Sequence, residues 1–106
     1  MKYYFVYILA SKQNGSLYIG VCNDLIRRTY EHKNKIFGGF TANHGIDKLV
    51  YYEVFNDIEQ AIKREKNIKK WKRNWKLRII IEKNPEWNDL YNDLTAGNDG
   101  PLPSQG

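Results

Sequence analysis

Apolar residues in the first half of the chain fall into three short runs rich in β-branched and aromatic side chains. Residues 3–9 have few polar interruptions, which predicts a strand buried on both faces. Residues 13–16 are Gln-Asn-Gly-Ser, and the Asn-Gly pair is the strongest short hairpin signal because both residues tolerate positive φ. Residues 17–21 are then expected to form the returning strand, and residues 48–55 a third strand.

Two helices are expected to begin at polar capping residues. Asn23-Asp24 can cap a helix over residues 25–35, and Asn56-Asp57 can cap another helix that follows the third strand. On the first helix, Asp24, Arg28 and His32 are spaced four residues apart and therefore share one face. The inward stripe of the second helix consists of Ile58, Ala61, Ile62, Glu65 and Ile68.

These elements predict one mixed α/β (α+β) domain. A chain of 106 residues is long enough for one domain with a modest core. We assign residues 1–94 to this domain, with a last short helix over residues 86–94. Residues 95–106 contain several Gly and Pro but one large apolar residue, so we interpret them as a disordered tail. The glycines in the loop over residues 37–45 indicate mobility or close approach to a ligand.

The positive charge of the chain is concentrated in one segment. The net charge is +5, yet residues 63–78 hold nine Lys or Arg and one acid, while the rest of the chain carries −3. Such a field attracts polyanions, of which phosphate backbones are the commonest, although a solvated charged helix face is the alternative. We expect a basic helix from Lys63 to Arg78. The candidate nucleic-acid-binding residues are Lys63, Arg64, Lys66, Lys69, Lys70, Lys72 and Arg73.

Composition argues against several other classes of protein. No run approaches the roughly 20 apolar residues of a membrane span, and the first residues lack the apolar run of a signal peptide. The single cysteine, Cys22, allows no internal disulfide, which is consistent with a reducing, cytoplasmic environment. No Cys/His cluster has the spacing of zinc ligands.

A set of polar side chains occupies positions where a simple fold would prefer apolar ones. Tyr7 lies in the first apolar run and Tyr18 in the second, Arg28 and His32 share a helix face, and Glu65 interrupts an apolar stripe. A carboxylate that points inward is costly, so Glu65 is expected to be ion-paired, protonated or bound to a metal. Two tyrosines, an arginine, a histidine and one carboxylate are the groups needed to cut a phosphodiester with one divalent cation.

The order and spacing of these residues resemble the paired motif of the GIY-YIG nuclease superfamily. The matching positions are Phe5-Val6-Tyr7, Tyr18-Ile19-Gly20, Arg28, His32 and the helix-borne Glu65. Over about residues 2–91 the chain also resembles the small stand-alone bacterial proteins of the UPF0213 type. The resemblance implies a three-stranded antiparallel sheet flanked by helices. It also implies hydrolysis of a nucleic-acid phosphodiester with one divalent cation.

The resemblance further implies a role for each matched residue. Tyr18 would act as general base or position water, and Arg28 would neutralise charge on the scissile phosphate. Glu65 would be the sole direct protein ligand to Mg²⁺ or Mn²⁺. Tyr7 and His32 would orient water or phosphate. This division is chemically consistent, because an arginine fork matches two phosphate oxygens and Mg²⁺ accepts one carboxylate while keeping several waters.

Three further positions bear on the resemblance. Phe5 replaces the first glycine of the family motif, and Val21 stands where some members carry a lysine that assists the tyrosine. If that lysine matters, the enzyme would be slower or would use a metal-bound water. Asn84 is a weaker candidate for a polar residue that some members place near the phosphate.

We therefore expect a metal-dependent endonuclease acting on DNA, in repair or recombination, with RNA as the alternative substrate and no membrane association. A lone domain of this size has no separate targeting domain, so DNA structure or a partner protein is expected to set the target. One competing class is a non-catalytic DNA- or RNA-binding module. Another is an adaptor whose basic helix and tryptophans dock an acidic protein, although Trp71 and Trp75 are more typical of helix packing.

Overall fold

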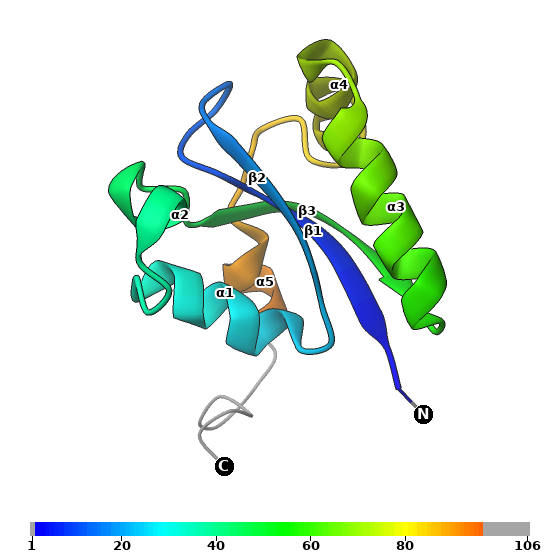
Figure 1. Cartoon of the computed structure of the whole chain (residues 1–106). Coiled ribbons are helices and arrows are strands. Elements are labelled where there is room, and N and C mark those ends of the chain that lie inside the picture. The colour runs from blue at the N-terminus through cyan, green and yellow to red at the C-terminus, as the bar shows by residue number, and fades with distance from the viewer. Residues whose placement is uncertain (1, 97–106) are drawn as a thin grey trace.

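The computed structural model describes residues 2–96, which form a three-stranded antiparallel sheet flanked by helices (Figure 1). The strands lie in the order β2-β1-β3, with helices α1 and α2 on one side of the sheet and α3 and α4 on the other. The predicted fold class is confirmed. Within residues 2–96 no helix is both long and apolar enough to cross a membrane. The elements are β1 (Tyr4–Ala10), β2 (Leu17–Cys22), α1 (Leu25–Lys33), α2 (Gly39–Asn43), β3 (Lys48–Phe55), α3 (Ile58–Lys70), α4 (Arg73–Lys83) and α5 (Leu90–Ala96).

Strand β1 is the centre of the sheet and is buried on both faces. It pairs with β2 along one edge and with β3 along the other, and residues 6–10 are all buried. Because successive side chains of a strand point to opposite faces, Val6 and Ile8 lie under α3 and α4, whereas Tyr7 and Leu9 face α1. The unbroken apolar run in the sequence therefore supplies two cores at once.

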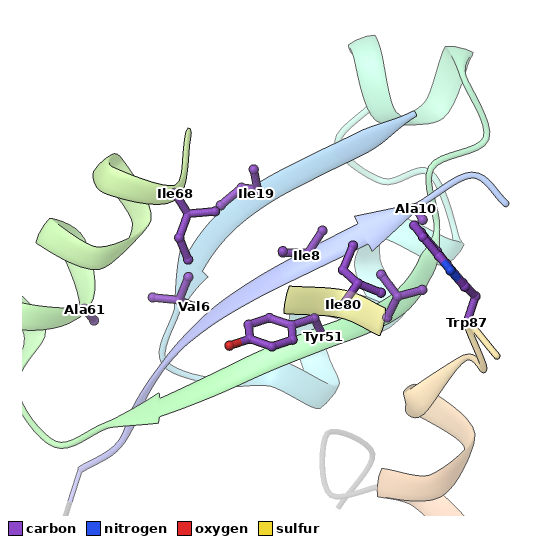
Figure 2. Close-up of a cluster of buried hydrophobic side chains, with 10 residues drawn as sticks. Val6, Ile8, Ala10, Ile19, Tyr51, Ala61, Ile68, Ile80 and Trp87 are labelled. Carbon is purple, nitrogen blue, oxygen red and sulfur yellow. The ribbon is translucent and has the colours of Figure 1, made fainter. Parts of the chain in front are cut away.

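The larger core lies between the sheet and the α3–α4 layer (Figure 2). Helix α3 contributes Ala61 and Ile68, and α4 contributes Ile80, all without exposed surface. Trp87, in the turn after α4, covers the end of this core and has φ of 58°, a value that bulky residues rarely adopt. The buried amide of Asn84 stabilises this turn: it donates to the carbonyls of Val50 (3.1 Å) and Asn88 (2.8 Å) and accepts from the Asn88 N–H (3.0 Å).

The connection from β1 to β2 is a loop over residues 11–16 rather than a two-residue turn. A type I′ turn places two central residues at positive φ, whereas in this loop only Asn14 has positive φ (59°). The N–H of Gly15 donates to the carbonyl of Lys12 (2.9 Å). Arg73 at the start of α4 donates to the carbonyls of Asn14 and Gly15 (2.7 and 2.6 Å), which ties the loop to the helical layer.

The basic segment forms two helices, so the prediction of one helix from Lys63 to Arg78 is wrong at its centre. Helix α3 ends at Lys70 and α4 begins at Arg73. The two residues between them have ψ of 152° and 150°, which is extended backbone that cannot continue a helix. Trp71 packs in this break beneath the guanidinium of Arg64, 5.0 Å from the ring centre. Trp75 is 58% exposed and is not a core residue, but its ring is tilted against that of Trp71 with ring centres 6.3 Å apart.

The C-terminal end of the described domain also differs from the prediction. Helix α5 begins at Leu90 rather than at residue 86, and it continues to Ala96. Thr95 and Ala96, which were assigned to the tail, are therefore part of a helix, and the Thr95 hydroxyl donates to the carbonyl of Tyr91 (2.9 Å). The remaining part of the predicted tail, residues 97–106, lies outside the described residues.

Docking of α4 onto the sheet depends on one buried isoleucine, and adjacent isoleucines provide a matched test. Ile80 has no exposed surface, whereas Ile81 is 46% exposed on the same helix. We expect Ile80→Ala to lower the free energy of unfolding by about 2–5 kcal/mol, because it leaves a cavity in the core. Ile81→Ala should lower it by less than about 1 kcal/mol. Urea denaturation of both variants measures the difference, and equal losses would contradict the described packing of α4.

Candidate active site

The two motif tyrosines lie on adjacent strands and on the same face of the sheet. In the β1–β2 pairing Tyr7 is opposite Gly20, and Tyr18 is opposite Leu9. Tyr7 and Tyr18 both belong to the side of the sheet covered by α1, and their ring centres are 6.3 Å apart. The hairpin therefore brings together two residues that are eleven positions apart in the sequence.

Gly20 is required by lack of space rather than by backbone conformation. A Cβ atom built on Gly20 would lie 2.5 Å from both Cζ and the hydroxyl oxygen of Tyr7. Atoms at that distance overlap, so the phenol ring of Tyr7 occupies the space that a side chain at position 20 would take. Tyr7 of the first half-motif and Gly20 of the second half-motif thus pack directly against each other.

Helix α1 presents Arg28 and His32 to the tyrosines. The helix begins where the Asp24 side chain accepts a hydrogen bond from the N–H of Arg27 (3.1 Å), as the sequence predicted. The ring centre of His32 is 5.3 Å from that of Tyr18 and 6.2 Å from that of Tyr7. Arg28 is partly exposed and pairs with Glu31 on its own helix (3.5 Å).

His32 is buried between two hydroxyl groups. Its Nε2 lies 3.4 Å from the Tyr7 hydroxyl, and its Nδ1 lies 3.3 Å from the hydroxyl of Thr41 in α2. Because a hydroxyl can donate or accept, this pair of partners satisfies a neutral imidazole in either tautomer. Burial lowers the pKa of His32, Arg28 lowers it further, and Glu31 only partly opposes them. His32 is therefore neutral near pH 7.

The two tyrosines differ in their access to solvent. Tyr7 is 1% exposed, and burial raises its pKa well above the ordinary value of 10.0, with a further increase from Tyr18 and partial opposition from Arg28. Tyr7 is consequently a neutral hydrogen-bonding group that cannot reach a substrate directly. Tyr18 is partly exposed. Of the two, Tyr18 is the tyrosine that a bound molecule would contact.

A cavity of about 260 Å³ opens above this cluster. It brings Tyr18, Arg28 and His32 together, as the resemblance implied, and adds residues of the loop over residues 37–45, whose glycines indicated mobility or close approach to a ligand but whose side chains had no individual role. Phe37 and Phe40 were the available signal, because these aromatic residues flank a double glycine in an otherwise polar stretch. The cavity is lined by Tyr18, Arg28, His32, Phe37, Gly38, Phe40 and Thr41.

Glu65 lies on the other side of the sheet. It is buried on the inward stripe of α3, as predicted, and its carboxylate forms an ion pair with Lys69 (2.6 Å). Among residues 2–96, no hydrogen bond or ion pair links Glu65 to the four residues of the tyrosine cluster. Helix α3 does pack on β2, the edge strand that carries Tyr18. A ligand that contacts both groups must therefore pass the free edge of β2.

The donor groups present fit a cation held by one carboxylate. In the described part of the chain no three His, Cys, Asp or Glu side chains are close enough to form a metal cage. Mg²⁺ keeps several waters and needs only one or two carboxylates plus substrate oxygens, so the hard oxygen ligands of Glu65 suit it. Its ion-pair partner Lys69 is half exposed and can leave the carboxylate without opening the core.

Some candidate nucleic-acid-binding residues already have protein partners. Arg64 donates two hydrogen bonds to the carboxylate of Glu53 (2.9 and 2.8 Å). Lys69 pairs with Glu65, and Arg73 holds the β1–β2 loop. The exposed lysines are therefore better placed for contact with phosphates than these three residues. Those lysines are Lys63, Lys66, Lys70 and Lys72.

Asn84 does not face the cavity. Its buried amide is fully engaged in the turn that follows α4, where it bonds to Val50 and Asn88. The structure gives Asn84 a clear structural role on the α4 side of the sheet.

Comparison with known proteins identifies the class to which this fold and site belong. A family model described as the GIY-YIG catalytic domain matches residues 3–89. The chain therefore belongs to the GIY-YIG family. It is similar to a UPF0213 protein of Clostridium perfringens, with 43% identity over 79 residues that cover 74% of this chain and 84% of that protein. A UPF0213 protein of Staphylococcus saprophyticus is 37% identical over 82 residues, which cover 77% of this chain and 99% of that protein.

A solved structure has the same architecture. The solution NMR structure of a UPF0213 protein from Bacillus halodurans matches with a TM-score of 0.52 and 27% sequence identity. The match covers 85% of this chain and 95% of that one. The predicted resemblance to the GIY-YIG superfamily and to its small UPF0213-type members is confirmed.

The contact between Tyr7 and Gly20 generates a stability prediction. Gly20→Ala should lower the free energy of unfolding by about 1–3 kcal/mol, because the new methyl group displaces the Tyr7 ring. In a Tyr7→Leu background, Gly20→Ala should lower the free energy of unfolding much less, because the tyrosine ring is absent. Urea denaturation of the two single variants and the double variant measures the coupling. Additive losses, within about 0.5 kcal/mol, would contradict the described contact.

The buried histidine generates a prediction about pH. The pKa of His32 is lowered from 6.5, so in a window below pH 6.5 the unfolded chain binds a proton that the folded chain does not. The contribution of the neutral His32 side chain to the free energy of unfolding is therefore fully present above pH 6.5 and is lost as pH falls. Denaturation at several pH values between about 5 and 7.5 should show this decline, and His32→Asn should reduce it. A decline equally steep in His32→Asn would contradict the assignment.

Proposed function

We propose that this chain hydrolyses phosphodiester bonds in DNA, using one divalent cation, Mg²⁺ or Mn²⁺, held by Glu65. The observation that carries the proposal is the convergence of Tyr18, Arg28 and a neutral His32 on one small cavity. Branched or nicked intermediates of repair and recombination are the expected substrates, with specificity supplied by their structure or by a partner protein.

Each group that lines the cavity has chemistry suited to a phosphate. The Arg28 guanidinium is partly exposed and can exchange its contact with Glu31 for two phosphate oxygens. The Tyr18 hydroxyl can accept a proton from an attacking water or hold that water in line. Because His32 is neutral, one of its ring nitrogens can accept a hydrogen bond. Buried Tyr7 acts on this arrangement indirectly, by orienting the imidazole.

Glu65 would complete the site from the opposite face of the sheet. A divalent cation held there would supply positive charge to the leaving oxygen and lower the pKa of a bound water. For the carboxylate to take part, Lys69 must release it, and its ammonium group then becomes available to a nearby phosphate. Since Glu65 and Tyr18 lie on opposite faces, we place the scissile phosphate at the free edge of β2.

A second candidate is a nucleic-acid-binding module without turnover. The observation in its favour is that the Glu65 carboxylate is engaged by Lys69 and has no contact with the tyrosine cluster among residues 2–96. The exposed lysines of α3 would then supply salt-dependent binding to DNA or RNA.

Cleavage of supercoiled plasmid and of labelled branched DNA distinguishes the two candidates. With Mg²⁺ or Mn²⁺ we expect cutting by the unmodified chain and none in EDTA. Glu65→Gln, Tyr18→Phe and Arg28→Ala should each reduce the rate by about 100-fold or more, because each removes a group that stabilises the transition state. The glutamine replaces the carboxylate with an amide of similar size.

Glu59→Gln provides the matched control for the charge. Glu59 is an exposed glutamate on the same helix, so its loss should leave cleavage unchanged. Metal-independent cutting, or equal activity of Glu65→Gln and Glu59→Gln, would sink the proposed role of Glu65. Salt-sensitive binding with no cutting by any of these proteins would favour the binding module.

A further inference from the structure

Two phenylalanines are exposed at the rim of the cavity and have no role in the function described so far. Phe37 is 52% exposed and Phe40 is 55% exposed, yet both line the cavity that holds Arg28. Large exposed aromatic residues that line a cavity also holding an arginine mark a surface that another molecule covers. Their position beside a phosphate-binding arginine indicates that the covering molecule carries a flat apolar group next to a phosphate.

Each ring contacts at least one side chain of the protein and is also more than half exposed. The Arg28 guanidinium lies over the ring of Phe37 at 5.4 Å, and the His32 ring is tilted against it at 4.9 Å. Phe40 stacks on His44 with ring centres 4.2 Å apart. The Nδ1–H of His44 donates to the carbonyl of Phe40 (2.9 Å), which fixes the imidazole in the orientation that supports the ring. Both rings therefore have supporting contacts within the protein itself.

The backbone between the two rings has a conformation that favours glycine. Gly38 and Gly39 have φ of 61° and 67°, and no atom lies within 4 Å of a Cβ built at either position. The glycines are therefore selected for the shape of the turn rather than for lack of space. That turn places Phe37 before helix α2 and Phe40 within it, and both rings end at the same cavity.

We propose that Phe37 and Phe40 form a stacking site for a nucleobase next to the scissile phosphate. The proposal rests on the proposed function, since it takes Arg28 as the phosphate ligand. A nucleotide combines a phosphate with a flat aromatic ring, and every base offers a face for stacking on an aromatic side chain. In an intact duplex both faces of a base are covered by its neighbours. The site therefore takes a base that is unpaired or displaced from the helix, as at a single-stranded arm, a branch or a gap.

Binding in EDTA tests this proposal without requiring cleavage. A fluorescein-labelled duplex is compared with the same duplex carrying a short single-stranded arm, by fluorescence anisotropy. We expect Phe37→Ala and Phe40→Ala each to weaken binding to the armed DNA by about 5-fold to 100-fold, the range given by stacking of one base. Binding to the plain duplex should change by less than about 2-fold. Circular dichroism should show folded variants, because both side chains are on the surface.

Matched variants separate stacking from general loss of apolar surface. Ile36→Ala removes a side chain that is 61% exposed in the same loop but does not line the cavity, and it should leave binding unchanged. Phe40→Trp should retain binding to the armed DNA, whereas Phe40→Leu should not, because leucine is apolar but has no flat face. A 2-aminopurine in the arm should lose fluorescence on binding to the unmodified chain and keep it with Phe40→Ala.

Three outcomes would overturn the stacking site. The alanine variants could lose binding to both DNAs equally, or they could bind both DNAs as well as the unmodified chain does. They could also change oligomeric state, which would show that the two rings form a contact between two copies of the chain. Metal-dependent cleavage with unchanged binding in the alanine variants would leave the proposed function standing and refute the stacking site. If the alanine variants lose binding only to the armed DNA and no protein cleaves, the stacking site stands and the proposed function is refuted.

Discussion

Burial of β1 on both faces, with a hydrogen-bonded neighbour along each edge, is the constraint on which the rest of the structure depends. A strand in this position has no solvent-facing side, so every one of its side chains from Val6 to Ala10 must be matched by a helix or loop packed above it. The helices of the two layers meet this requirement separately. Tyr7 is the polar exception among these five residues, and its hydroxyl has His32 as a hydrogen-bonding partner.

The same constraint determines how the candidate site is divided. Because side chains alternate along a strand, the layer that receives Tyr7 and Tyr18 is not the layer that receives Glu65. His32 connects the first group: it contacts both tyrosines, Thr41 and Phe37, so the orientation of one imidazole links β1, β2, α1 and the loop before α2. Glu65 lies on α3, which packs on β2, the strand that carries Tyr18 on its other face. The candidate site thus has two parts, one on each side of the edge strand β2.

Sequence patterns predicted most of the fold, and their failures have physical causes. The third strand was predicted with its observed bounds, because a run of β-branched and aromatic residues between polar turns has few other solutions. The break at Trp71 and Lys72 was missed, since both residues are acceptable in a helix and the extended backbone there depends on packing of Trp71 against Arg64. The convergence of Tyr18, Arg28 and His32 was implied by the resemblance to the GIY-YIG superfamily, whereas the positions of Phe37 and Phe40 depend on the path of a glycine-containing turn, which periodicity does not describe. The sequence left Glu65 open as an ion-paired, a protonated or a metal-bound carboxylate, and the observed pairing with Lys69 is the first of these alternatives.

The contact between Tyr7 and Gly20 has a consequence for how such chains can diverge. The tyrosine ring fills the space above a backbone position on the neighbouring strand, so a side chain cannot be added at position 20 while that ring is present. A lineage that acquires a side chain at position 20 must first, or at the same time, reduce the one at position 7, and the intermediate with both is disfavoured. Among related sequences a side chain at position 20 should therefore occur only where position 7 is smaller than tyrosine, even though neither residue needs to touch a substrate. Identity at such a pair records the geometry of the hairpin and is weaker evidence of shared chemistry than identity at Tyr18 or Arg28.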